Sequence, residues 1–80
     1  MPTIKRIEPY RFFFFSNEGS DQAHVYVQHE NRLAKFWLEP VGPSWSNRFP
    51  ASELTKIREL VLENQRFFLP AWYELFAPRR

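Results

Sequence analysis

Residues 24–38, which read HVYVQHENRLAKFWL, contain the clearest structural pattern in this sequence. Two runs of strand-forming residues flank a polar pair at 30–31, a pattern typical of a β-hairpin with a tight turn. Side chains alternate between the two faces of a strand, so a turn at this pair fixes which residues face each other. The pairs expected on the buried face are Val27 with Ala34 and Val25 with Phe36.

The same register places a different set of side chains on the opposite face of the hairpin. His24 is expected opposite Trp37, and Tyr26 opposite Lys35. A shift by one residue would mix apolar and polar side chains on both faces, so the pattern specifies the register. Asn31 tolerates the positive φ that such a turn requires.

Strand-forming residues also precede the hairpin, at 3–7 and in the aromatic run at 12–15. A chain of 80 residues, 44% of them apolar, is long enough for one domain with its own core. Residues 40–50 are rich in proline, glycine, serine and asparagine, which indicates a linker between strands and helix. We therefore predict a single domain over 1–80, with strands in 3–39, a linker over 40–51 and a helix over 52–76.

The helix is predicted from the spacing of its apolar residues. At 100° per residue, Leu54, Ile57, Val61 and Phe68 fall in one stripe, which is typical of a helix packed on a sheet. Because Trp72 and Phe76 continue in phase past Pro70, the pattern favours one long helix, kinked near Pro70 and capped by Ser52. The alternative is a new helix that begins at Pro70.

The predicted fold class is therefore α+β, with a small antiparallel sheet of three to four strands on one long C-terminal helix. Trp72 and Phe76 are expected to pack on the same sheet or on a second copy of the chain, which would make a homo-oligomer. The expected core residues are Val25, Val27, Phe36, Leu38, Leu54, Ile57, Val61 and Phe68.

Composition excludes several function classes. The chain has no cysteine, which excludes disulfides, thiolate zinc sites and a cysteine nucleophile. His24 and His29 lie on opposite faces by parity, and with only two glycines there is no phosphate-binding loop. We expect neither a metal site nor a cofactor. No window of about 18 apolar residues exists and the start has no signal peptide, so we expect a cytoplasmic protein with no membrane contact.

The face that carries His24, Tyr26, Lys35 and Trp37 is the predicted partner-binding site. A single helix covers one face of a small sheet, which leaves this mixture of aromatic and cationic side chains on the other. Such a face suits a protein interface, or RNA whose bases stack while cations contact phosphates. A third alternative is that the 40–50 linker folds over this face as a second small core, with Val41, Trp45 and Phe49.

Several segments together resemble a small bacterial family of unknown function. They are the start MPTI, residues 10–19 (YRFFFFSNEG), residues 24–27 (HVYV), residues 34–41 (AKFWLEPV) and residues 60–65 (LVLENQ). The family's genes often stand beside a second small gene, in pairs that resemble toxin–antitoxin modules. The resemblance implies a bacterial cytoplasmic protein whose partner is a small protein encoded by a neighbouring gene.

The chain departs from the family's PPHVHV motif at three positions. Tyr26 stands where the family has its second histidine, and Gln22 and Ala23 replace the two prolines. Two hypotheses follow. The first is a protein-binding component of a toxin–antitoxin-like pair, and the alternative is an RNA-binding domain or ribonuclease. In the ribonuclease hypothesis, His24 and Tyr26 are the catalytic candidates.

Overall fold

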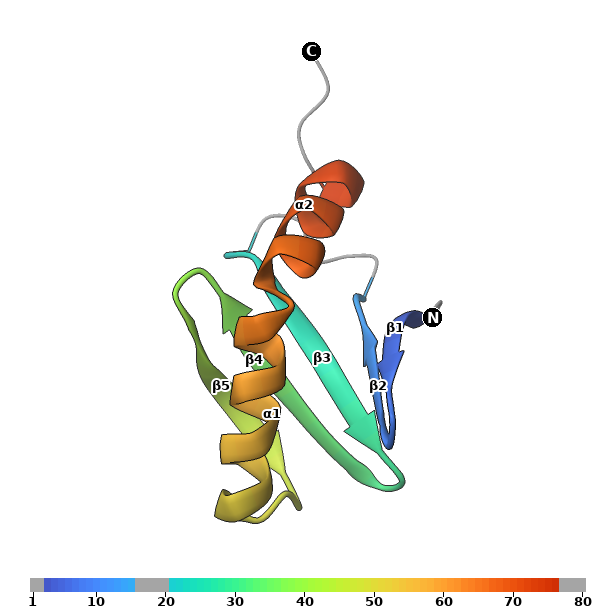
Figure 1. The fold of residues 1–80 in the computed structure, drawn as a ribbon, viewed down its shortest axis with the longest axis vertical. Helices are drawn as coiled ribbons and strands as arrows, with labels where there is room; N and C mark the ends of the chain where they lie inside the picture. The colour runs from blue at the N-terminus through green and yellow to red at the C-terminus, as the bar shows by residue number, and fades with distance from the viewer. Residues whose placement is uncertain (1–2, 16–20, 77–80) are drawn as a thin grey trace.

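The computed structural model describes residues 3–15 and 21–76 (Figure 1). Five antiparallel strands form one sheet in the order β1-β2-β3-β4-β5, and two helices lie across one of its faces. The residues 16–19 of the family motif lie outside the described residues. The elements are β1 (Thr3–Ile7), β2 (Tyr10–Phe13), β3 (His24–His29), β4 (Arg32–Leu38), β5 (Val41–Asn47), α1 (Ala51–Glu63) and α2 (Gln65–Phe76).

The hairpin register predicted from parity is confirmed. Strands β3 and β4 pair Val25 with Phe36, Val27 with Ala34, His24 with Trp37 and Tyr26 with Lys35. The turn lies at 30–31 as expected, but the positive φ, 57°, falls on Glu30 rather than on Asn31. The alternation of apolar and polar residues therefore determined which face of each strand is buried.

The predicted sheet of three to four strands is wrong, because the predicted linker contains a fifth strand. A two-residue turn after Leu38 brings Val41 opposite it and starts β5 along the edge of β4. Proline and glycine are poor strand formers, but an edge strand tolerates a residue without an N–H on its outer side. Pro43 and Gly42 therefore occupy an edge strand, next to a register shift between Lys35 and Phe36.

The prediction of one long helix kinked near Pro70 is also wrong. The chain forms two helices that meet at Asn64, whose φ of −106° and ψ of 14° are not helical. The Asn64 side chain donates to the Leu60 carbonyl at 2.8 Å, and its backbone N–H also contacts that carbonyl at 3.1 Å. Asparagine side chains compete with the helix for backbone partners in this way, so the first helix ends here.

Proline is accommodated inside α2, and the cap of α1 differs from the prediction. Pro70 lies in the middle of α2 and is exposed, so it removes one hydrogen bond on the solvent side without ending the helix. The cap of α1 is Pro50, which makes no side-chain capping bond, and not Ser52. The extended backbone of Pro50 supplies its carbonyl to the N–H groups of Glu53 and Leu54 at 3.0 Å.

The core lies between the helices and the sheet. Of the eight predicted core residues, all are buried except Leu54, which is partly buried against the cluster. Phe49, from the predicted linker, also enters this core beside Tyr10, with ring centroids 6.4 Å apart. Trp72 is buried within the chain, where it packs on Phe14 and Phe76. Self-association through Trp72 and Phe76 stays a prediction.

Within the described residues, neither helix has the length and apolar character that crossing a membrane would require.

Candidate partner-binding face

The sheet surface opposite the helices is lined by alternate residues of β2 to β5. We call this surface the aromatic face. Register pairs Phe13 with Tyr26, Tyr26 with Lys35, and Lys35 with Trp45, so these side chains form a row across four strands. The aromatic face also includes Arg11, Phe15, Gln28, Leu33 and Trp37.

His24, predicted for this face, is fully buried at the end of the sheet. Its ring lies against Trp72 of α2, with centroids 4.6 Å apart, and against Tyr26 at 5.4 Å and Trp37 at 6.0 Å. The Nδ1 atom is 2.6 Å from the backbone carbonyl oxygen of Gln22, an arrangement in which Nδ1–H donates. His24 is thus held among aromatic rings, where a partner would not contact it directly.

Tyr26 is also buried, by the side chains of its own face. The Phe15 ring contacts it edge-on at 4.5 Å, the Phe13 ring stacks at 5.7 Å and the Trp45 ring lies at 6.2 Å. Aromatic pairs at these separations are favourable beyond the area that they bury. The face therefore closes over Tyr26 without a covering helix.

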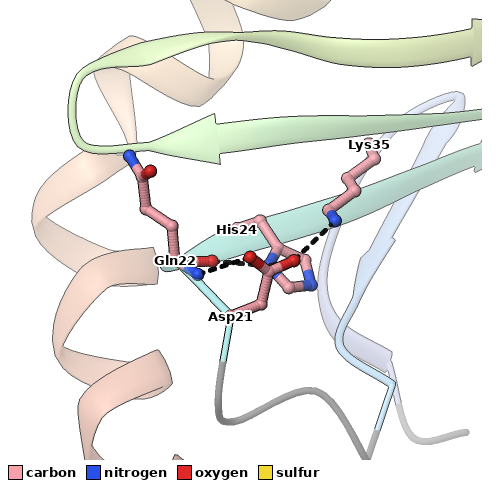
Figure 2. A network of polar contacts seen from close by, with 4 residues as sticks. All are labelled: Asp21, Gln22, His24 and Lys35. Atoms are coloured by element: carbon pink, nitrogen blue, oxygen red, sulfur yellow. Dashed lines mark hydrogen bonds and ion pairs between the residues drawn. The ribbon is translucent and has the colours of Figure 1, made fainter.

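Lys35 is paired with Asp21, in the segment just before β3 (Figure 2). Its Nζ atom donates to Asp21 Oδ2 at 2.9 Å and lies 4.8 Å from the centre of the Trp37 ring. The hydrogen bond from Lys35, assisted by the backbone N–H of Gln22, holds the pKa of Asp21 below its ordinary value. Figure 2 also shows the Asp21 carboxylate beside His24, with Oδ2 at 4.0 Å from Nδ1. Lys35 is therefore the positive half of an ion pair rather than an isolated cation.

Trp45 is the most exposed large aromatic residue of this face, with 44% of its surface accessible. Trp37 is half-buried on the neighbouring strand β4, opposite Gly42. Val41, Trp45 and Phe49 were predicted to fold over this face, but only Trp45 lies on it. Phe49 packs in the core on the helix side, and Val41 is packed against that same core.

A hollow of about 240 Å³ lies at the β2 end of the aromatic face, lined by Arg11, Phe13, Phe15, Gln28 and Leu33. The guanidinium carbon of Arg11 lies 4.5 Å from the centre of the Phe13 ring, and Nη1 donates to Gln28 Oε1 at 2.8 Å. Arg11 was not among the site residues predicted from the sequence. Once β2 is placed beside β3, the strand parity that identifies Phe13 also identifies Arg11.

A second polar cluster ties the helix layer to the sheet. The Tyr10 hydroxyl donates to Glu53 Oε2 at 2.8 Å, and His29 Nδ1 is 3.6 Å from the same oxygen. Burial, with the bond to Glu53, raises the pKa of Tyr10 to about 12, and this bond lowers the pKa of Glu53. His29 and His24 thus lie on opposite sides of the sheet. In the described ranges, no three His, Asp or Glu side chains form a group that could hold a metal ion.

A five-stranded meander with helices on one face and an aromatic surface on the other defines a small α+β domain. The chain belongs to the family described as domain of unknown function DUF4160, which matches residues 10–73. The match runs from the start of β2 into the last turns of α2, so it includes the whole aromatic face. Neither a curated protein nor a solved structure matches this chain.

Proposed function

We propose that this protein is the protein-binding component of a toxin–antitoxin-like pair, and that its partner docks on the aromatic face. The observation that carries the proposal is the exposed Trp45, which shares the sheet face without helices with the half-buried Trp37. Tryptophan, tyrosine and arginine are enriched at the centres of protein interfaces, and exposed clusters of them are uncommon elsewhere. The gene-pair resemblance supplies the partner class, a small protein encoded by a neighbouring gene.

The residues that line the hollow beside Arg11 indicate which side chains the partner would place there. Four of its lining residues contribute aromatic, aliphatic or neutral polar groups, and Arg11 contributes a guanidinium. A partner that places an apolar side chain in the hollow and a carboxylate near the guanidinium would match both. We therefore expect an interface with an apolar centre and an acidic contact at the β2 end.

Binding fits the geometry better than catalysis on this face. A general acid or base must come within hydrogen-bond reach of its substrate, about 2.6–3.2 Å. His24 and Tyr26, the catalytic candidates of the ribonuclease hypothesis, are both buried under other rings. RNA binding without catalysis needs only exposed rings and cations, and it is one outcome of the test below.

The test is to express the chain with the product of the neighbouring gene and to measure binding by calorimetry. Trp45→Ala should weaken binding at least tenfold, about 1.4 kcal/mol, because a central tryptophan is a common anchor. Leu62→Ala is the matched control, because Leu62 is a similarly exposed apolar side chain on α1, 51% accessible. That variant should bind within about twofold of the parent protein.

Two results would contradict this proposal. The first is that the two proteins fail to associate, and the second is that Leu62→Ala weakens binding as much as Trp45→Ala. A partner that proves to be single-stranded RNA gives a third pattern. Affinity would then fall steeply with salt, and Lys35→Ala would reduce that salt dependence.

A further inference from the structure

A second surface, on the opposite side of the sheet, has the form of a peptide-binding groove. It lies between strand β1 and helix α2 and encloses a hollow of about 290 Å³. We call it the β1–α2 groove. Its lining is mostly apolar, with Ile4 and Phe14 from the sheet side and Ala71, Glu74 and Leu75 from the helix.

The helix wall of this groove is an apolar stripe. Phe67, Ala71 and Leu75 follow one another at intervals of four residues, so they lie on the same side of α2. Phe67 is 45% accessible and Leu75 is 56% accessible, which is high for side chains of this size. The Lys5 Nζ atom lies 4.8 Å from the centre of the Phe67 ring, so this stripe faces β1.

The strand wall of the groove is a sheet edge. Strand β1 is the first in the strand order and pairs only with β2 among the described residues. In an antiparallel pair, alternate residues direct their N–H and C=O groups away from the partner strand. A register shift interrupts the pairing of both edge strands, but only the opposite edge, β5, also contains a proline, Pro43, which hinders strand addition. Strand β1 is therefore the edge better able to accept another strand.

Charge distinguishes between two possible occupants of this edge. If two copies of the chain paired antiparallel through β1, centred on Lys5, the two Lys5 side chains would face each other. Directly opposed like charges destabilise a strand pair. A strand with acidic side chains on the face away from the helices would instead meet Arg6 favourably. The acidic group nearest to Arg6 in the chain is Glu8, with Nε and Oε2 3.9 Å apart on exposed side chains.

We propose that the β1–α2 groove binds an extended, acidic segment of a partner protein, which pairs with β1 as a sixth strand. An apolar side chain of this segment enters the hollow between Ile4 and Leu75 on the helix side, while carboxylates on the other face of the added strand lie beside Arg6. Strand addition of this kind obtains affinity from backbone hydrogen bonds and specificity from pockets for alternate side chains. The proposal is independent of the aromatic face, because the two surfaces lie on opposite sides of the sheet.

The probe is a synthetic peptide of about ten residues that alternates glutamate with valine or leucine, a length suited to one strand. It is titrated into the isotope-labelled full chain, and binding is followed by amide chemical shifts and hydrogen exchange. We expect shifts in Lys5, Arg6, Ile7 and Leu75, and slower exchange of the outward amides of β1. A peptide with proline at alternate positions should not bind, because it lacks the backbone donors.

Two matched variants locate the site. Leu75→Ser should weaken peptide binding about tenfold, because it removes an apolar wall of the hollow. Leu62→Ser alters a side chain of the same type and similar exposure on α1 and should leave binding unchanged. Arg6→Glu should also weaken binding, and more strongly at low salt than at high salt.

Four results would overturn the proposal: no binding of the alternating peptide, equal binding of its proline version, equal loss in the two leucine variants, or shifts centred on Trp45. Slower exchange of β1 amides at high protein concentration without peptide would assign the edge to a second copy of the chain. None of these results affects the proposal for the aromatic face, whose test is the Trp45→Ala variant with the neighbouring gene product.

Discussion

The two faces of this sheet bury their aromatic residues in different ways. On the helix side, Phe12, Val25 and Phe36 are fully buried beneath Ile57 and Val61 of α1 and the residues of α2. The aromatic face has no covering element among the described residues. Its buried members are closed off by neighbouring rings and by one ion pair.

Because of this difference, we expect the helix side of the sheet to contribute mainly to folding stability and the aromatic face to contribute mainly to binding. Side chains between two layers lose nearly all their contact with water, and each contributes roughly 1.5–3 kcal/mol by burial. Rings that cover one another in a single layer leave the outermost ones accessible, as Trp45 is. We expect substitutions on the helix side to act on folding, and substitutions at the rim of the aromatic face to act on binding.

The largest effect is expected for Phe36→Ala. Phe36 is fully buried in the helix-side core, so its truncation leaves a cavity that the packed layers cannot fill. The free energy of unfolding should fall by about 3–5 kcal/mol, measured by denaturant titration. Trp45→Ala is the comparison and should change it by less than about 1 kcal/mol. Similar losses in both variants would remove the distinction between the faces.

An intermediate effect is expected for Trp37→Ala, which lies between the two cases. Trp37 is half-buried and packs on Lys35 and His24. We expect a loss of about 1 kcal/mol in unfolding free energy and a loss of about 2 kcal/mol in partner binding. Both are measured on the same preparation, with binding expressed per folded molecule. A loss in stability alone would place Trp37 with the structural residues of its face.

The smallest effect concerns one carboxylate on each side of the sheet. Asp21 and Glu53 both have pKa values lowered in the fold, by hydrogen bonds from Lys35 and Tyr10 respectively. The unfolded chain takes up these protons at a higher pH than the folded chain does. Stability from both groups is therefore present above about pH 4 and is lost as the pH falls through the folded pKa.

Asp21→Asn and Glu53→Gln should each make the loss of stability below about pH 4 less steep, as measured by thermal unfolding across pH. The two sites share no partner, so the double variant should flatten the profile by the sum of the two single effects. Unchanged profiles in both variants would show that neither hydrogen bond persists in solution.

The elements predicted correctly from the sequence are those specified by the periodic spacing of apolar residues within one segment. The β3–β4 hairpin is fixed by alternation over 24–38, and the buried stripe of Ile57, Val61 and Phe68 is fixed by helical spacing. Phase alone did not reveal the helix boundary, because Asn64 interrupts the backbone without disturbing the order of apolar residues. Pro70 was expected to cause the kink, but it lies within α2 on the exposed side.

The sequence predicted that four residues lie together on one face, but it did not predict how buried their side chains are. Parity placed His24, Tyr26, Lys35 and Trp37 together, and the register confirms that they are neighbours. Their burial depends on side chains from distant segments: Trp72 lies against His24, Phe15 against Tyr26, and Asp21 binds Lys35. Their role with a partner stays a proposal.

Residue order alone specified which side of β3 and β4 faces the core, because side-chain alternation is a property of neighbouring residues. Long-range packing, by contrast, makes the proline-containing segment at 41–47 into strand β5. Its propensity for strand is weak, and it is the backbone edge of β4 that supplies its hydrogen-bond partners. The same holds for both candidate surfaces, since a face or a groove is open or closed according to which distant segments pack against it.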